Sequence, residues 1–339
     1  MASAWAKAAG GLGAGLALGW LVRTVRRSAY SFRGKVVVIT GGSRGLGLLM
    51  ARELADEGAQ LALLARDEAE LQRAEDELDA RGAEVLTVVC DIREQDEARA
   101  AIHRVIEAFG HVDVLINNAG VMQVGPLDHL TVSDFEEAIA VHTFGPLYMV
   151  LAVLPHMLER GEGRIVNIAS IGGKIAFPHL LPYTTSKFAL VGLSDGLRAE
   201  LRRSNLRVTT VCPGLMRTGS PINVRFKGYN RREQTWFTIS DSLPVVSING
   251  RRAARRIIDA CRRGAPVTYV SAMSRMAVLV DGLTPSLVAR MLAAANQVLP
   301  SPHPDRADES FTGRESRSQW SPSLLTRLSD RAAIANNET

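Results

Sequence analysis

A tyrosine and a lysine four residues apart, in the stretch 183-YTTSK-187, are the side chains of this sequence best suited to proton transfer. Residues at this spacing lie on one face of a helix. A free tyrosine has a pKa of about 10, and a neighbouring ammonium lowers that pKa by favouring the phenolate. Only five of the 40 basic residues are lysines, and lysine, unlike arginine, can release a proton. Tyr183 and Lys187 therefore predict a general acid/base pair.

A glycine-rich turn, 40-TGGSRGLG-47, lies between an apolar run at 35–40 and a helical pattern at 46–58. Glycines after a strand let the backbone approach a pyrophosphate, which the free N–H groups of the following helix stabilise. A glycine turn alone is weak evidence, but here the strand before it and the helix after it are both present. The turn predicts a dinucleotide site.

Two arginines bear on which dinucleotide binds. An acid at the end of the second strand of such a site accepts a hydrogen bond from the ribose 2′-hydroxyl. This chain has Arg66 there and Arg44 in the glycine turn, and both guanidinium groups can pair with a 2′-phosphate. Asp67 could face the ribose instead, which would favour NAD. We predict NADP(H) as the cofactor.

The elements that must position these residues alternate along the chain. Apolar strands are expected at 35–40, 60–66, 84–91, 112–117, 163–170, 206–213 and 266–270, and helices at 46–58, 67–81, 93–109, 131–160, 182–204 and 249–263. This alternation predicts an α/β fold with a parallel sheet covered by helices on both faces. Residues 214–248 are read as a mobile loop or lid, residues 276–299 as a helical extension, and residues 300–339 as a disordered tail.

The N-terminal segment 1–32 differs from the rest in composition. Residues 8–22 carry no charge over 15 residues and precede the basic run 23-RTVRR-27. This run is shorter than the about 20 residues that a spanning helix usually needs, but a basic flank after an apolar run is typical of a membrane segment. We therefore predict membrane contact through residues 8–27, on the cytoplasmic face. The alternative is a disordered arm on a cytoplasmic protein. The net charge of +5 comes from the five basic residues of segment 1–33, which has no acid. The rest of the chain has 35 basic and 35 acidic residues and is therefore neutral.

That neutral balance does not predict a nucleic-acid binder, whose charge would lie on the folded domain. The basic stretch 251–263 is read as a solvated helix face. Three cysteines with no paired spacing fit neither a disulfide framework nor a zinc site, and no metal is predicted.

Several motifs together resemble the short-chain dehydrogenase/reductase family, over about residues 33–275. They are 40-TGGSRGLG-47, 117-NNAG-120, Ser170, 183-YTTSK-187 and 213-PGLMRT-218, in the order the family has them. The resemblance implies a Rossmann fold with a single, doubly wound, parallel sheet of seven strands. It also implies hydride transfer with a nicotinamide, and a homo-oligomer.

The resemblance assigns roles residue by residue. Tyr183 is expected to be the acid/base, Ser170 to orient the carbonyl, and Lys187 to bind the nicotinamide ribose. The expected cofactor-binding residues are Thr40, Gly41, Ser43, Arg44, Gly45, Leu46, Gly47, Arg66, Asp91, Ile92, Asn118, Ala119, Gly120, Tyr183, Lys187, Pro213, Gly214 and Thr218. Asp91 is expected to meet the adenine, and Thr218 the nicotinamide carboxamide.

One position departs from the family pattern. The family's fourth catalytic residue, an asparagine, aligns with His142 in 141-VHTFG-145. In the family a backbone carbonyl at this position is thought to hold a water of the proton relay, and a carbonyl survives any substitution. An imidazole also titrates near neutral pH, so His142 is expected to be a tolerated catalytic residue that alters pH dependence. The alternatives are a histidine that only packs in a helix and a site that has lost its chemistry.

The resulting hypothesis is an NADP(H)-dependent oxidoreductase that interconverts a carbonyl and an alcohol on an apolar lipid, steroid, retinoid or fatty-acyl substrate. Residues expected at the mouth of the site are Phe177, Pro178, Leu180, Leu181, Met216, Phe226, Trp236 and Phe237. Two alternatives stay open: a membrane-anchored NADP-binding scaffold or redox sensor without turnover, and a lipid-biosynthetic reductase with one acyl-chain substrate.

Overall fold

The computed structural model describes residues 30–244, 246–305, 309–321, 323 and 326–339. Residues 32–339 form one compact unit, so the expected domain at 33–275 and the segments after it belong together. The segment 8–27, for which membrane contact was predicted, lies outside the described residues.

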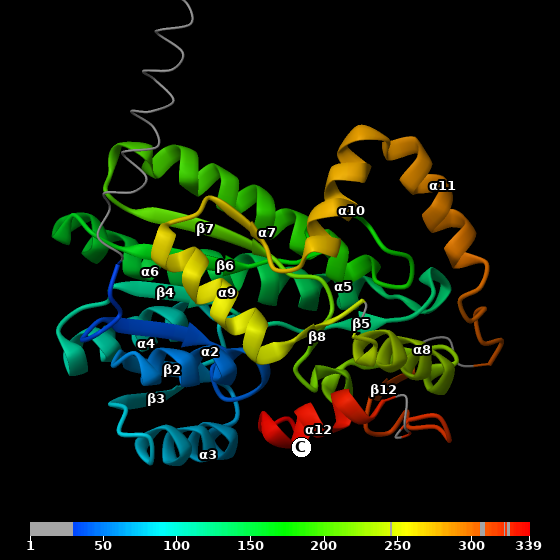
Figure 1. Cartoon of the computed structure of the whole chain (residues 1–339), viewed down its shortest axis with the longest axis horizontal. Coiled ribbons are helices and arrows are strands. Elements are labelled where there is room, and N and C mark those ends of the chain that lie inside the picture. Colours follow the sequence, from blue (N-terminus) through cyan, green and yellow to red (C-terminus); the bar gives the residue numbers. More distant parts are fainter. Residues whose placement is uncertain (1–29, 245, 306–308, 322, 324–325) are drawn as a thin grey trace, which may run out of the picture. The chain divides into compact units, whose positions relative to one another are not determined.

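A parallel sheet of seven strands forms the centre, in the order β11-β7-β6-β4-β1-β2-β3. Its strands are β1 (Val36–Thr40), β2 (Gln60–Ala65), β3 (Val85–Val89), β4 (Val114–Asn117), β6 (Arg164–Ile168), β7 (Arg207–Cys212) and β11 (Val267–Tyr269). The chain crosses from β3 back to β4 beside β1, which is the point where strand order reverses and ligands bind in open α/β sheets. This confirms the predicted doubly wound fold (Figure 1).

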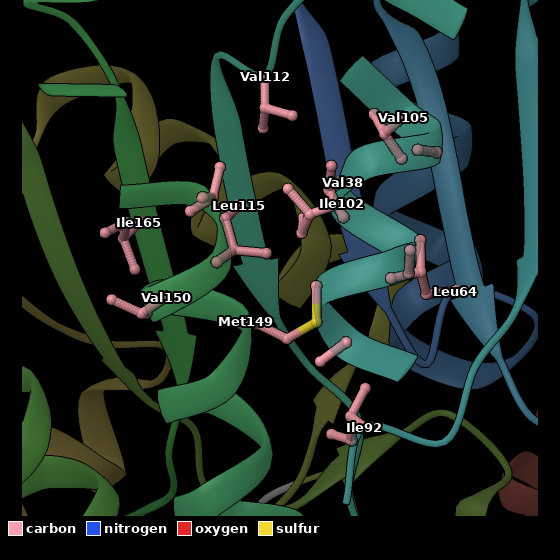
Figure 2. Packing of buried hydrophobic residues seen from close by; sticks show 14 of the residues in the cluster. Val38, Leu64, Ile92, Ile102, Val105, Val112, Leu115, Met149, Val150 and Ile165 are labelled. Atoms are coloured by element: carbon pink, nitrogen blue, oxygen red, sulfur yellow. The ribbon is translucent and has the colours of Figure 1, made fainter. Parts of the chain in front are cut away.

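Both faces of the sheet are covered. The helices around it are α2 (Gly45–Asp56), α3 (Glu68–Asp79), α4 (Gln95–Phe109), α5 (Val132–Ile139), α6 (Gly145–Arg160), α7 (Leu181–Glu200) and α9 (Gly250–Arg263). Val38 of β1 and Leu64 of β2 pack against Ile102 of α4 and Met149 of α6 (Figure 2). Because side chains alternate along a strand, Ile39 points to the other face, and it is fully buried as well.

The long helix expected at 131–160 is interrupted where the unusual histidine lies. A π-helical turn, Ala140–Phe144, joins α5 to α6 and contains His142. Such turns re-aim side chains and are frequent at functional sites. The stretch Val132–Arg160 is apolar and long enough to cross a membrane, yet 44% of its most apolar window is buried in the protein, as in a core helix.

The region expected to be a mobile lid is built from regular elements. They are β8 (Met216–Arg217), the 3-10 turn Ser220–Asn223, β9 (Arg225–Lys227), α8 (Asn230–Ser242) and β10 (Ile248–Asn249). β9 pairs with β5 (Gln123–Val124) and with β12 (Ser310–Thr312) in a three-stranded sheet. The expectation of an irregular lid was wrong because these short elements pair with residues far away in sequence.

Three helices lie in the described residues of the C-terminal part. The helical extension consists of α10 (Ala272–Leu283) and α11 (Pro285–Asn296), bent by 117° at the break between them (Figure 1). The tail 300–339 was expected to be disordered, but its described residues include β12 and α12 (Arg327–Ala335). Polar side chains of the tail form buried hydrogen bonds with α8. Ser329 donates to Asp241 at 2.8 Å, and Ser316 accepts from Asn230 at 3.1 Å.

Candidate active site

One cavity of about 720 Å³ contains nearly all of the predicted site residues, at the carboxyl ends of the central strands. The predicted residues lining it are Gly41, Ser43, Arg44, Gly45, Leu46, Arg66, Asp91, Ile92, Asn118, Ala119, Gly120, His142, Ser170, Tyr183, Lys187, Pro213, Gly214 and Thr218. Thr40 and Gly47 do not line it, but both contact residues that do: Thr40 bonds with Asn118, and Gly47 packs against Gly41. The structure therefore brings together the glycine turn and the Ser–Tyr–Lys set.

The glycine turn has the backbone that its sequence requires. Gly41 and Gly45 have positive φ values of 62° and 55°, which residues with a side chain rarely adopt. A Cβ on Gly41 would lie 2.9 Å from the Cα of Ala119. The turn can therefore come close to the neighbouring strand and present the N-terminus of α2 to the cavity.

The stretch 117-NNAG-120 fastens the end of β4 to the glycine turn. The Asn118 amide donates to the carbonyls of Thr40 and Gly41, both at 3.1 Å. The Thr40 hydroxyl accepts from the backbone N–H groups of Asn118 at 3.0 Å and Ala119 at 3.1 Å. These four bonds explain why Thr40 serves the site without lining it.

The catalytic candidates come from two elements. Ser170 follows β6 and accepts from the Gly172 N–H at 2.9 Å, while Tyr183 and Lys187 lie one turn apart on α7. The Ser170 hydroxyl lies close enough to the Tyr183 phenol to act on its pKa. Lys187 donates to the Ile168 carbonyl at 2.8 Å, and its Nζ lies 5.7 Å from the centre of the Tyr183 ring.

The protonation of this set differs from the expectation that Lys187 lowers the pKa of Tyr183. Burial raises the pKa of Tyr183 to about 12, although the Ser170 hydroxyl works against it. Burial also lowers the pKa of Lys187 to about 7. The same cause, desolvation, shifts both pKa values, because both side chains are buried away from bulk water. At neutral pH the phenol thus keeps its proton, while Lys187 can gain or lose one.

His142 is held on both ring nitrogens. Its Nε2 accepts from the Val121 N–H at 3.1 Å, so Nδ1 carries the proton and donates to the Ser186 hydroxyl at 2.7 Å. Ser186 in turn donates to the Tyr183 carbonyl at 2.9 Å. Burial, with the charge of Lys187, lowers the pKa of His142 well below its ordinary value. The expectation that it titrates near neutral pH is therefore wrong: a neutral His142 braces the Tyr183 helix against the Val121 loop.

At the adenosine end the charged residues are already partnered. Arg44 pairs with Glu70 at 2.8 Å, and Arg66 is exposed with Asp91 4.0 Å away. Asp67, the acid that could face the ribose, also lines the cavity, and one of its carboxylate oxygens caps α3 by accepting from the Glu70 N–H at 2.8 Å. The cap leaves the two arginines as the groups of this corner suited to a phosphate.

Asp91 is also engaged within the protein. Arg93 binds its carboxylate through both guanidinium and backbone N–H groups, at 2.9 and 3.0 Å for Nε and 3.0 Å for the N–H. Although burial works against it, these bonds lower the pKa of Asp91. The carboxylate therefore stays charged at the cavity wall.

Of the expected mouth residues, Met216 alone lines the cavity, and Phe177, Pro178 and Leu181 do not. Phe226, Phe237 and Trp236 pack with one another in a small separate core with Leu180. Phe226 is fully buried and makes an edge contact with Phe237 at 6.0 Å between ring centres. The aromatic residues of this region thus build a support for the cavity wall and do not form its lining.

Sequence reasoning missed Glu70, Asn223 and Glu338, which also line the cavity. Glu70 sits on α3 and pairs with Arg44, and no sequence pattern marks this pairing. Glu338 comes from the tail that was expected to be disordered. Among the described residues, no group of three or more His, Cys, Asp or Glu side chains could hold a metal ion.

The basic stretch 251–263 forms α9. Its apolar side is buried, while Arg251 and Arg255 both pair with Glu53 of α2, at 2.6 and 2.8 Å. Arg262 pairs with Glu57 at 2.6 Å. These arginines help to hold α9 on α2.

Comparisons with known proteins agree with this geometry. The family model described as short chain dehydrogenase matches residues 35–226. "Dehydrogenase/reductase SDR family member 7B" of Mus musculus is 32% identical and covers 81% of this chain and 84% of its own length. The protein of that name in Danio rerio is 35% identical, over 85% of this chain and 93% of its own.

Two solved structures are similar as well. A short chain dehydrogenase/reductase from Burkholderia phymatum in complex with NAD has a TM-score of 0.67, with 27% identity over 76% of this chain and 96% of its own. A metagenomic short-chain oxidoreductase in complex with NADP has a TM-score of 0.52, with 39% identity over 55% of this chain and 84% of its own. The chain therefore belongs to the short-chain dehydrogenase/reductase family, whose fold binds a nicotinamide cofactor.

Proposed function

We propose that the protein is an NADP(H)-dependent oxidoreductase that interconverts a carbonyl and an alcohol on an apolar substrate. The observation that carries the proposal is one cavity in which Ser170, Tyr183 and Lys187 face the same space as Arg44 and Arg66. A cofactor that reaches from the arginines to the tyrosine would fill this cavity end to end. NADP(H) is favoured over NAD(H) because two guanidinium groups, those of Arg44 and Arg66, line the cavity, and one oxygen of the acid next to Arg66 is used as a helix cap.

In the direction of reduction, a nicotinamide held by this cavity would supply the hydride that the carbonyl carbon receives. Ser170 would hold the carbonyl oxygen by a hydrogen bond, and Tyr183 would give that oxygen its proton. The raised pKa of Tyr183, about 12, keeps the phenol protonated and suits this donor role. Lys187, with a pKa of about 7, can then return a proton toward the site from water.

The apolar substrate class is supported by the helices beside the cavity. Their exposed apolar side chains are Met273, Met276, Leu279, Val280, Leu283, Leu287 and Met291. Within α10 and α11 only Ser274 is buried. A Cβ on Gly214, in the cavity wall, would meet the Ser274 hydroxyl, so α10 begins at the cavity.

We propose membrane contact through this helix pair as well as through residues 8–27. Each helix has 12 residues and is about 18 Å long, shorter than the roughly 30 Å of a bilayer core. The pair would therefore lie in the interface, apolar side down. In a chain that starts at residue 30, flotation with liposomes should be lost on changing Leu283 and Met291 to Asp; flotation unchanged by these changes would contradict the proposal.

The function is tested by NADPH oxidation in the presence of aldehydes, ketones and long-chain ketones. Turnover should vanish in Tyr183→Phe and persist in Tyr148→Phe, a matched change at a tyrosine that stacks on Phe144 outside the cavity. Tight NADPH binding without turnover of any substrate, unaffected by either change, would support a non-catalytic scaffold instead.

A further inference from the structure

The last residues of the chain lie in the cofactor cleft. α12 packs on α8 and on the 3-10 turn Ser220–Asn223, and its C-terminal end is at Ala335 (Figure 1). The chain then turns at Asn337, which has a left-handed φ of 58°. The Glu338 side chain that follows is only 6% exposed and lines the same cavity as Tyr183.

This segment binds the glycine turn directly. The Gly45 N–H, at the first residue of α2, donates to the Asn336 carbonyl at 2.9 Å. The Asn337 amide donates to the Ser43 carbonyl at 2.9 Å, and a Cβ on Gly45 would collide with the Glu338 carboxylate. These are the positions at which the N-terminus of such a helix receives dinucleotide phosphates.

The same segment also binds the opposite wall of the cleft. The Asn336 amide donates to the Thr218 carbonyl at 2.9 Å. The Asn223 amide donates to the Glu338 carboxylate at 2.6 Å. Residues 336–338 therefore bridge the glycine turn and the loop after β7, between which a dinucleotide would have to pass.

We propose that residues 336–338 are an autoinhibitory plug that competes with the nicotinamide dinucleotide for the glycine turn. The inference rests on the cofactor site proposed above. The cofactor binds when the segment leaves the cleft, and the docked segment lowers the apparent affinity for the cofactor by the fraction of molecules it closes.

Charge makes simultaneous occupancy unfavourable. Glu338 lies 3.5 Å from the Arg44 guanidinium, which Glu70 also binds at 2.8 Å. A cofactor phosphate at Arg44 would meet both carboxylates at short range, and like charges repel strongly in a cleft shielded from water. Release of Glu338 removes one of them.

The plug can leave without disturbing the sheet. Besides the cleft, its main polar contacts are with side chains of two helices: Arg52 binds the carbonyl of Ala335 at 2.8 Å and the amide oxygen of Asn336 at 3.0 Å, and Arg73 binds Asn337 at 2.6 Å. None of these contacts is to a strand of the central sheet, and segments outside the core open locally at lower free energy than the core.

The plug also carries a pH signature. The groups facing Glu338 are Arg44, Glu70 and Asn223, and the buried Asp241 carboxyl interacts with it as well. Burial and Glu70 raise the pKa of Glu338 to about 7, while Arg44 and Asn223 work against them. The docked pKa thus lies above the ordinary value of 4.5. Docking is therefore favoured at low pH and weakens as the pH rises through 7. The plug should close the cleft more firmly at pH 6 than at pH 8.

The test is the dissociation constant of NADPH for the full chain, for a chain lacking residues 336–339, and for Glu338→Gln, from energy transfer between tryptophan and the nicotinamide. Deletion should tighten binding about tenfold, as for a cleft closed in about nine of ten molecules. The gain should be larger at pH 6 than at pH 8, and Glu338→Gln should lose this pH dependence. Thr339→Ala, at the exposed neighbouring residue, should bind as the full chain does.

A synthetic peptide of residues 327–339 separates competition from misfolding. Added to the shortened chain, it should weaken NADPH binding, and a scrambled peptide should not. Equal binding by the full and shortened chains, or weaker binding by the shortened chain with no effect of the peptide, would overturn the plug. Failure of both chains to bind NADPH or NADH would overturn the cofactor site itself, and the plug with it.

Discussion

The two ends of the cleft are held in different ways. At the Ser–Tyr–Lys end the partners are backbone groups of the central sheet region, such as the Ile168 carbonyl for Lys187 and the Gly172 N–H for Ser170. At the glycine turn the partners include, besides Asn118, acidic side chains and the segment 336–338. The sheet fixes the first set, whereas a short C-terminal segment completes the second. The chemistry should therefore tolerate changes in the tail, and cofactor affinity should not.

Among the substitutions that test this difference between the two ends, Tyr183→Phe should have the largest effect. Removing the hydroxyl removes the proton donor, and positioned acid/base groups contribute about 10²–10⁴-fold. The change should lower kcat by that factor while the dissociation constant of NADPH stays within about twofold, because the ring remains. A large loss of NADPH affinity with kcat retained would show that the tyrosine serves binding.

Lys187→Arg tests the proton relay at the same end. In the parent protein the protonated fraction of Lys187 falls as the pH rises through its pKa of about 7, whereas an arginine stays charged throughout. We expect kcat to fall by about 10²-fold and the pH-dependent step near pH 7 to disappear. Lys174→Arg, outside the cavity lining, is the control and should keep the step; a step that persists in Lys187→Arg would assign it to another group.

Arg66→Ala tests the other end of the cleft. A charged hydrogen bond contributes about 1.5–3 kcal/mol, so NADPH binding should weaken by about tenfold to a hundredfold while NADH binding is unchanged. Arg81→Ala, at a surface ion pair with Glu77, should change neither. Equal weakening for both cofactors would contradict a 2′-phosphate contact at Arg66.

The smallest effect on activity is expected at His142. His142→Asn can keep one of the two bonds to Val121 and Ser186, so activity should fall only about threefold and the pH profile should not move, because the imidazole is neutral. His142→Ala leaves both partners unpaired and should cost about 1–3 kcal/mol of unfolding free energy, measured by denaturant titration. A pH profile that shifts in His142→Asn would restore the titrating role.

The sequence predicted the motif-bearing half of the molecule well, and for a physical reason. Strands β1 to β4, β6 and β7 are apolar runs between helices with their own periodicity, and the glycine turn needs backbone angles that glycine alone adopts easily. The spacing of Tyr183 and Lys187 is fixed by the helix. Local patterns of this kind determine both the elements and the side chains they carry.

The remainder depends on contacts between distant residues. β9 becomes a strand because it pairs with β5 and β12. Asn336 has a defined position because its carbonyl accepts a hydrogen bond from the Gly45 N–H and its side-chain amide donates one to the Thr218 carbonyl. The tail is polar, and polar composition alone predicts disorder. The state of His142 likewise follows from burial between Val121 and Ser186, which no local pattern reveals.

Hydride transfer assisted by Tyr183 can be measured directly by following the hydrogen that moves from the nicotinamide to the substrate. NADPH carrying deuterium at C4 is mixed with a long-chain ketone and excess protein for a single turnover, and the alcohol is analysed by mass spectrometry. We expect one deuterium on the alcohol carbon and a rate at least about a hundredfold lower in Tyr183→Phe. Binding of NADPH with no deuterium in any product, the same in both proteins, would contradict it.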